Sequence, residues 1–456
     1  MIDNNNLQQR DNFGSRLGII AAAAGSAIGL GNIWKFPYIT GVYGGAAFIL
    51  VYLICIALIG FPLMLSEFLV GRKAQKNAVG AFKRLAPGTP WFMTGWMGVV
   101  AAFVILSFYS VVAGWCLEYI VKAVTGVFTG STPEQINAIY EGFTTAAVKP
   151  IVWTIIFMGI TCWIVMAGIK DGIEKYAKFL MPLLLVIIII LDIRAVTLPG
   201  AGSGLAFLFK PDWSKINGEA VLAALGHAFF SLSLGMGTMI TYGSYIGKKE
   251  NLGETAIQVT IADTLIALLA GIAIFPAVFA FGIEPGAGPR LVFVTLPNVF
   301  QQMPGGYFFG ILFFVLLTVA ALTSSISILE VVVAYFSEEL KWSRKKATFA
   351  AGGAITVMGI LCALSYASSS AFSKVKLIQG TVFMDSMMWL SDNLLLPIGG
   401  LLVCVFVGWV LGRKKVEEEV NSEGNHLGYM PFFMVAVKFI APIAIAIVFL
   451  KGVGII

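Results

Sequence analysis

The chain contains 456 residues, of which 58% are hydrophobic and 12% charged, and its formal net charge is +6. A soluble domain carries roughly 25% charged residues, so this composition excludes a soluble protein and indicates a polytopic membrane protein. The basic residues stand in short clusters between apolar runs, which is typical of membrane-protein loops and not of a nucleic-acid-binding surface.

Eleven apolar runs are candidates for membrane spans, because a helix needs roughly 20 such residues to cross the hydrocarbon core. The runs are continuous rather than alternating, which favours helices over barrel strands. They cover residues 15–37, 44–70, 91–124, 151–168, 176–198, 219–246, 256–282, 304–338, 347–366, 381–411 and 431–450. The sequence therefore predicts an all-α membrane protein with a single transmembrane domain over residues 1–456.

Lysine and arginine residues precede the first run and fill every second loop after it, for example at 72–84, 341–346 and 413–415. Cytoplasmic loops carry the excess of basic residues, so we expect the amino terminus in the cytoplasm and the protein in the cell inner (plasma) membrane. With eleven spans, the carboxyl terminus is expected outside.

Few residues suggest catalysis. Five cysteines lie singly within apolar runs and only two histidines occur, which argues against a disulfide framework or a transition-metal centre. The chain has no GxxxxGK[ST] phosphate loop, and no nucleophile–histidine set can be assembled. We therefore expect neither an enzyme nor an organic cofactor.

The first and sixth runs share an unusual interruption. The first contains Gly25-Ser-Ala-Ile-Gly-Leu-Gly-Asn-Ile-Trp34, and the sixth contains Ser231-Leu-Ser-Leu-Gly-Met-Gly237. Glycine costs about 1 kcal/mol per helical position relative to alanine, so both clusters weaken their helices near the membrane midplane. The two runs are five spans apart and enter from opposite sides, which points to a transporter site between inverted repeats. The alternative is that small residues only allow close helix packing.

Short oxygen- and amide-bearing side chains accompany both breaks: Ser26, Asn32, Ser231 and Ser233. Together with freed backbone carbonyls, they suit a hard alkali cation better than a transition metal. Another polar cluster, Thr323-Ser324-Ser325, lies in the eighth run, where hydrogen bonding to the helix's own carbonyls is the alternative interpretation.

Asp263 lies about a third of the way into the seventh run, among apolar neighbours. A carboxylate at such a depth costs about 2.5–3.5 kcal/mol on insertion scales, so it should face the protein interior with a partner. No basic residue is near it in the sequence, which favours a bound cation; a protonated or water-solvated acid is the alternative. Glu67 and Glu330 are weaker candidates, and Glu67 is suited to accept hydrogen bonds from unwound backbone of the sixth run.

Three stretches, at 25–37, 230–237 and 322–325, carry a resemblance to a known family. With them, the chain resembles the neurotransmitter:sodium symporters, and in particular their bacterial amino-acid transporter branch, over nearly its whole length. The resemblance implies a LeuT-like fold with two inverted five-helix repeats, at about 13–198 and 219–412, and spans 1 and 6 unwound at the midplane. One extra helix, at about 431–450, would follow the repeats, so that eleven spans replace the usual twelve.

The resemblance also implies two sodium sites and one substrate site at the breaks. One Na⁺ would take the carbonyls of Gly25, Ile28 and Ala320 and the hydroxyls of Thr323 and Ser324. The other would take Ala27, Asn32, Ser231 and Asp263. The substrate carboxylate would rest on Leu30, Gly31 and Tyr109, its amine on Ala27, Phe230 and Ser231, and its side chain among Ile105, Phe230, Ser233, Met236, Ser324 and Ile328.

Two positions depart from the family pattern near the expected ion site. Asp263 stands where members usually carry asparagine, and Ala267 stands where chloride-dependent members carry serine. A fixed negative charge beside sodium would replace chloride, so we expect chloride-independent transport.

Two gates follow from the same resemblance. At the outer gate, Lys35 replaces the usual arginine, and Asp385 is the expected acidic partner because the family's acidic position aligns on Met388. At the inner gate, Arg10 would pair with Glu338, with Phe13 and Tyr245 packed nearby.

Together these features predict a symporter that imports a neutral, hydrophobic or aromatic amino acid with sodium across the lipid bilayer by alternating access. A proton-coupled transporter of the same architecture, with Asp263 as proton carrier, is the alternative. A sensor that binds an amino acid without transporting it, or a membrane-embedded enzyme, is the rival from another class.

Overall fold

The computed structural model describes residues 11–282 and 288–455, and within these ranges the chain forms helices and no strands. Nine helical runs in the described ranges are long and apolar enough to cross a membrane. They are formed by α3 and α4 (Ala46–Cys55, Phe61–Ala74), α6 (Phe92–Val124), α8 (Val148–Met166), α9 (Lys175–Val196), α13 (Leu252–Ala280), α15 (Gly306–Glu339), α16 (Arg344–Tyr366), α17 to α19 (Phe383–Leu390, Leu396–Val405, Gly412–Val420), and α20 and α21 (Met430–Val435, Ala441–Gly452). The predicted all-α membrane architecture is confirmed.

The predicted first and sixth spans are each split into two helices. Helix α1 (Arg16–Ala27) meets the helical segment Gly31–Val42, which ends in α2 (Phe36–Val42), at an angle of 52°. Helices α11 (Gly218–Ser231) and α12 (Thr238–Gly243) are separated by residues 232–237, and α12 is far too short to span by itself. The eleven predicted spans thus correspond to nine continuous helical runs and two interrupted ones within the described ranges.

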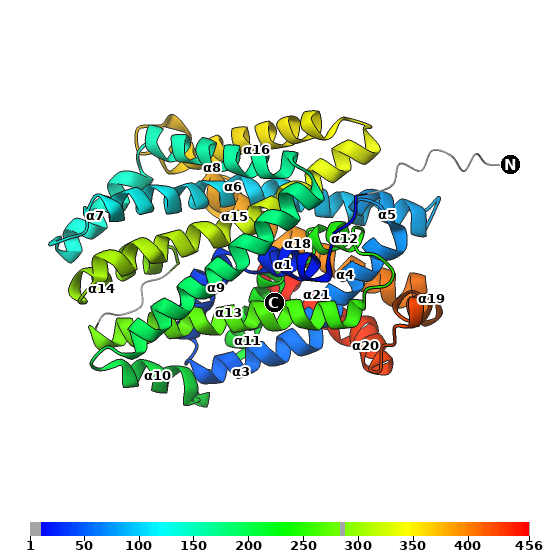
Figure 1. Ribbon diagram of the computed structural model, residues 1–456, viewed down its shortest axis with the longest axis horizontal. Helices are drawn as coiled ribbons and strands as arrows, with labels where there is room; N and C mark the ends of the chain where they lie inside the picture. The colour runs from blue at the N-terminus through cyan, green and yellow to red at the C-terminus, as the bar shows by residue number, and fades with distance from the viewer. Residues whose placement is uncertain (1–10, 283–287, 456) are drawn as a thin grey trace.

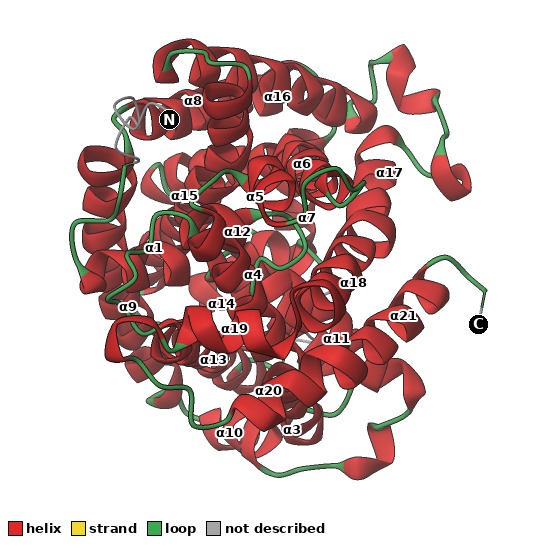
Figure 2. Cartoon of the chain, turned by 90° about the vertical axis from the view of Figure 1, so that its right-hand side faces the viewer, coloured by secondary structure: helices red, strands yellow, loops and turns green. Residues whose placement is uncertain are grey.

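The long helices run along one axis of the molecule (Figure 1). The two longest, α6 and α15, pack against each other over much of their length. Short helices cap the two ends of the bundle. Helices α7 (Pro133–Thr144), α10 (Ala201–Phe209) and α14 (Leu296–Gln302) gather at one end, and α5 (Ala78–Leu85), α19 and α20 gather at the other. Seen end-on in Figure 2, α4 and α12 lie near the middle of the bundle with longer helices around them.

Five helices begin directly after a π-helical turn and have proline as their second residue: Pro37, Pro62, Pro297, Pro397 and Pro442. Proline has no N–H to donate, and its ring clashes with the carbonyl four residues earlier, so the preceding turn widens. The helices therefore continue through these prolines instead of ending at them.

The two helix breaks have a local cause in the sequence. Helix α1 ends at Ala27, where Ile28 adopts an extended conformation with ψ 101°. In the second break, Ser233, Gly235 and Gly237 all have positive φ values, of 53°, 79° and 76°, which residues within a right-handed helix do not adopt. Because both breaks lie between packed helices, their backbone polar groups need partners other than water.

Candidate functional site at the helix breaks

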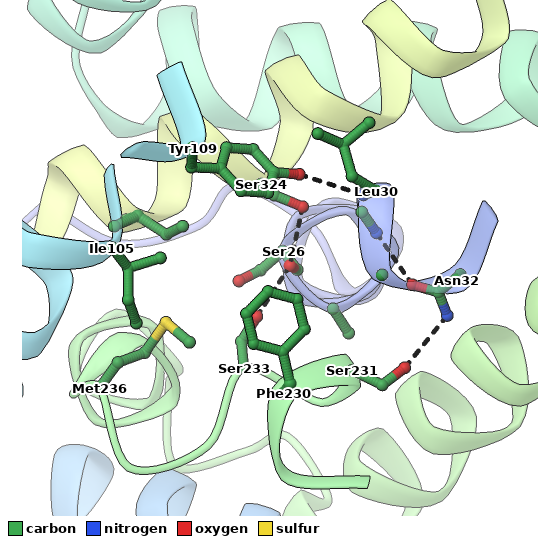
Figure 3. A pocket seen from close by; sticks show the side chains of 14 residues that line it. Ser26, Leu30, Asn32, Ile105, Tyr109, Phe230, Ser231, Ser233, Met236 and Ser324 are labelled. Atoms are coloured by element: carbon green, nitrogen blue, oxygen red, sulfur yellow. Dashed lines mark hydrogen bonds between the residues drawn. The ribbon is translucent and has the colours of Figure 1, made fainter. Parts of the chain in front are cut away.

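A small cavity lies between the two breaks and the helices α6 and α15 (Figure 3). Its volume of about 20 Å³ accommodates roughly one water molecule, so the site is closed in this conformation. The lining contains all eleven residues expected to bind substrate, namely Ala27, Leu30, Gly31, Ile105, Tyr109, Phe230, Ser231, Ser233, Met236, Ser324 and Ile328, and adds Ser26, Gly29 and Asn32. Their role in binding stays a prediction.

Side chains from other helices hold the backbone of the first break. The Tyr109 hydroxyl accepts a hydrogen bond from the Leu30 N–H at 3.1 Å, and the Ser233 hydroxyl donates to the Ser26 carbonyl at 2.9 Å (Figure 3). A Cβ on Gly29 would lie 2.7 Å from Ser324 Oγ and 2.9 Å from the Tyr109 hydroxyl oxygen. Only glycine therefore lets the chain pass this close to both hydroxyl groups.

The second break is held by Glu67, which is fully buried. Its Oε1 accepts a hydrogen bond from the Gly235 N–H at 2.7 Å. This confirms that Glu67 binds unwound backbone of the sixth span. A buried carboxylate here replaces the carbonyl that an unbroken helix would supply.

Asp263 is fully buried beside the first break and is surrounded by neutral donors. Its Oδ1 accepts from Asn32 Nδ2 at 2.7 Å, and the Ser231 hydroxyl lies 3.0 Å from Oδ1 and 2.8 Å from Oδ2. In the described part of the chain, no lysine, arginine or histidine forms an ion pair with this carboxylate. Three of the four residues expected at one sodium site are thus in direct contact, with a negative charge that no basic side chain in these ranges balances.

The residues expected at the other sodium site also come together. The Ser324 hydroxyl reaches across from α15 to the carbonyls of Gly25 at 3.4 Å and Ile28 at 3.2 Å. The Thr323 hydroxyl instead lies 3.1 Å from the Ala320 carbonyl of its own helix. The alternative interpretation of the eighth-span cluster, in which hydroxyls bond to their own helix, therefore describes Thr323 but not Ser324.

The expected outer gate contains a charged pair next to the cavity. Lys35 Nζ lies 3.1 Å from Asp392 Oδ2 and 4.6 Å from the ring centre of Phe230, which lines the cavity. The expectation that Asp385 partners Lys35 is wrong, because Asp385 accepts a hydrogen bond from the Tyr366 hydroxyl at 2.5 Å instead. Asp392 lies two helical turns further along the chain, next to Lys35.

The expected inner gate lies where the segment before α1 meets the end of α12. The Phe13 ring packs edge-on against Tyr242 at 5.6 Å and Tyr245 at 6.1 Å, and the Phe13 N–H donates to the Tyr245 carbonyl at 3.2 Å. The expected partner of Glu338, Arg10, lies outside the described residues. Glu338 Oε2 accepts hydrogen bonds from the backbone N–H of Asn77 at 2.9 Å and from its side-chain amide at 3.2 Å.

Sequence reasoning missed a second charged contact at this end. Glu330 is fully buried and binds Arg344 through both carboxylate oxygens, at 3.2 and 2.5 Å, while also accepting from the Tyr245 hydroxyl at 2.7 Å. The available signal was an acidic residue in the eighth run and an arginine three residues before the ninth. Tyr245 connects this ion pair to the Phe13 ring.

Comparison with known proteins identifies the family. The sequence profile of the sodium:neurotransmitter symporter family matches residues 10–138 and 133–455. An uncharacterized sodium-dependent transporter of Bacillus subtilis (strain 168), YhdH, is 41% identical over 97% of this chain and 98% of its own length. An uncharacterized sodium-dependent transporter of Haemophilus influenzae is 38% identical over 98% of this chain and 99% of its own length.

Among solved structures, MhsT in complex with L-phenylalanine matches with a TM-score of 0.89 and 48% identity, over 97% of this chain and 100% of that chain. The match agrees with the all-helical architecture described above. The chain therefore belongs to the sodium:neurotransmitter symporter family and is a sodium-dependent membrane transporter of LeuT-like fold, not an enzyme.

Proposed function

We propose that this transporter imports a neutral amino acid with a hydrophobic or aromatic side chain, coupled to sodium, by alternating access. One observation carries the proposal. Asp263 is buried beside the cavity, and in the described ranges only neutral donors such as Asn32 and Ser231 contact it. A carboxylate at this depth needs a compensating cation, and a co-transported sodium ion supplies it.

The chemistry of the cavity favours an amino-acid substrate. The Leu30 and Gly31 amides and the Tyr109 hydroxyl are donors for a carboxylate, and the carbonyls of Ala27 and Phe230 are acceptors for an ammonium group. The remaining lining is mainly apolar, from Ile105, Phe230, Met236 and Ile328, with the Ser233 and Ser324 hydroxyls available to a polar substituent. A relative of 48% identity binds L-phenylalanine, which fits this lining.

Two sodium ions are proposed. The first is held by Ala27, Asn32, Ser231 and Asp263, next to the substrate carboxylate, so ion and solute stabilise each other. The second is held by Gly25, Ile28, Ala320, Thr323 and Ser324, between α1 and α15. Bound at this second position, sodium ties α1 to α15, and its loss frees α1 to move.

The orientation and location are proposed from the distribution of charge. The end of the bundle that carries α5 and α19 holds basic clusters such as 72–84 and 413–415. We place this end and the amino terminus in the cytoplasm, the carboxyl terminus of this sequence outside, and the protein in the plasma membrane. The whole chain acts as one transport domain with repeats at about 13–198 and 219–412.

Reconstitution tests the proposed function directly. An inward sodium gradient is expected to drive accumulation of labelled phenylalanine in proteoliposomes at constant pH, because sodium and substrate bind together. Competition by the other amino acids should be strongest for leucine, methionine, tyrosine and tryptophan. Accumulation driven by a pH gradient without sodium would favour the proton-coupled alternative, and binding without accumulation would favour a sensor.

Chloride is expected to be dispensable for this uptake. Asp263 supplies the fixed negative charge beside the first sodium position, and Ala267, one turn later on α13, has no hydroxyl with which to bind an anion. Replacing chloride by gluconate on both sides should change the initial uptake rate by less than about twofold. A large loss of uptake in gluconate would contradict this prediction.

A further inference from the structure

Glu174, directly before α9, contacts the two residues that precede α1 through both of its carboxylate oxygens. Oε2 accepts a hydrogen bond from the Gly14 backbone N–H at 2.6 Å, and Oε1 accepts from the Ser15 hydroxyl at 2.9 Å. The glutamate is 3% exposed. Hydrogen bonds to a buried carboxylate are stronger than those between neutral groups, so this contact attaches the segment before α1 to the start of α9.

The first turn of α1 is shaped to receive this carboxylate. Ser15 caps the helix by accepting from the Gly18 N–H at 3.1 Å, and its hydroxyl hydrogen is thereby directed toward Glu174. A Cβ at Gly18 would overlap the Glu174 carboxylate, so the absence of a side chain lets the two helices approach. Helices α1 and α9 pack side by side (Figure 1).

The contact can also be released at limited cost. Lys178, one turn along α9, lies 2.5 Å from Glu174 Oε1 and would still balance its charge if α1 moved away. An open cavity of about 580 Å³, lined among others by Gly14, Lys170 and Lys175, adjoins the carboxylate and gives water access to it. After α1 moves away, the Glu174 carboxylate would still be paired with Lys178 and would be hydrated. Its charge would therefore not be left buried without a partner, so the contact with α1 can break and form again.

We propose that Glu174 is a positioning residue that holds α1 against α9 while the cytoplasmic side is closed, and that breaking this contact is a step in opening that side. The proposal rests on the proposed transport cycle, in which the inward-open state releases the solute. Phe13 lies directly before Gly14 and covers Tyr242, so detachment of this segment from Glu174 uncovers the inner pathway.

The experiment measures the accessibility of a cysteine beneath Phe13 in the full-length protein. Tyr242→Cys places a thiol at a site that is 1% exposed, and Cys162→Ser removes the one native cysteine in the described ranges that is only half-buried. In this background, Glu174→Gln is expected to raise the rate of labelling by a membrane-impermeant maleimide in inside-out vesicles about tenfold, because a charge-assisted hydrogen bond is lost.

Two further variants separate this role from general destabilisation. Gly18→Ala displaces the carboxylate by steric overlap and should raise labelling to a similar extent, while the double variant Gly18→Ala/Glu174→Gln should exceed neither single variant by more than about twofold. Glu254→Gln is the matched control. It removes the Arg16–Glu254 ion pair, which also attaches α1, but the Glu254 side chain is 55% exposed, so this pair contributes little. Labelling in this control should stay within about twofold of the background.

Three outcomes would each overturn the proposal. The labelling rate could stay unchanged in Glu174→Gln, or it could rise equally in Glu254→Gln. The increases in labelling rate caused by Gly18→Ala and Glu174→Gln could also multiply in the double variant. If Glu174→Gln fails to fold, judged by gel filtration, Gly18→Ala alone decides between the same outcomes. Labelling does not require transport, so absence of sodium-driven uptake by the wild-type protein would refute the proposed function without deciding the role of Glu174.

Discussion

Asp263→Asn is expected to reduce sodium-driven uptake by at least about 100-fold, whether chloride is present or not. The carboxylate is fully buried, and in the described ranges it contacts only neutral donors, among them Asn32 and Ser231. Removing one partner of a buried charge pair costs about 3–5 kcal/mol, and 1.36 kcal/mol corresponds to a factor of ten. In the proposed cycle two sodium ions enter with an amino acid whose carboxylate and ammonium charges cancel. Asp263 balances one of the two added positive charges, so without it both stay unbalanced.

A matched double variant is expected to restore a negative charge near this position by allowing chloride to bind. Asp263→Asn/Ala267→Ser introduces a hydroxyl one helical turn from the vacated charge, at a position that is also fully buried. This double variant should recover part of the uptake in chloride buffer and lose it in gluconate. Initial uptake rates in proteoliposomes, with protein amounts matched by gel filtration, check both expectations. A single variant with more than half of the wild-type rate, or a double variant indifferent to chloride, would contradict the role of Asp263.

Much of the fold could be predicted from the sequence because the bilayer restricts the possible structures. Continuous apolar runs can only be helices, and glycine clusters in two runs of opposite direction locate the breaks. The expected cavity residues came from the resemblance to the symporter family, and all eleven line the cavity. The sequence does not predict which residues of two packed helices lie at the same depth and therefore contact each other.

The Lys35–Asp392 pair illustrates this limit. Asp385 and Asp392 are seven residues apart, so they lie on nearly the same helix face and differ by about 10 Å in depth. Periodicity cannot choose between them. In the structure, Lys35 pairs with Asp392, which lies in the π-helical turn Ser391–Leu395 before Pro397. Asp385 instead accepts a hydrogen bond from Tyr366 of the neighbouring helix α16.

Glu330 and Arg344 illustrate a second limit. They lie fourteen residues apart on consecutive helices, and their contact depends on how α15 and α16 pack after the turn at residues 340–343. Nothing in the local pattern fixes that packing. The single strong hint was the burial of an acidic residue within an apolar run, which predicts a partner but does not identify it.

Ser324→Ala is expected to raise the sodium concentration required for half-maximal substrate binding by about tenfold or more, since one oxygen ligand of the second proposed ion is lost. The Ser324 hydroxyl lies within 3.4 Å of the Gly25 and Ile28 carbonyls, so it converges with them on one point between α15 and α1. Binding of labelled phenylalanine to the purified protein, titrated with sodium at constant ionic strength, measures the effect. Thr323→Val is expected to act in the same direction, because its hydroxyl belongs to the same proposed set.

Ser327 provides the control on the same pair of helices. Its hydroxyl donates to Ser26 Oγ at 2.7 Å, one turn along α15 from Ser324, but it is not among the proposed ligands. Ser327→Ala removes a buried contact between α15 and α1 without removing an ion ligand. The sodium concentration for half-maximal substrate binding should therefore shift by less than about twofold, while the free energy of unfolding falls by about 1 kcal/mol. Equal sodium shifts in Ser324→Ala and Ser327→Ala would mean that helix packing, not ion ligation, sets the dependence. A shift confined to Ser324→Ala and Thr323→Val supports a sodium ion that fastens α1 to α15 until release begins.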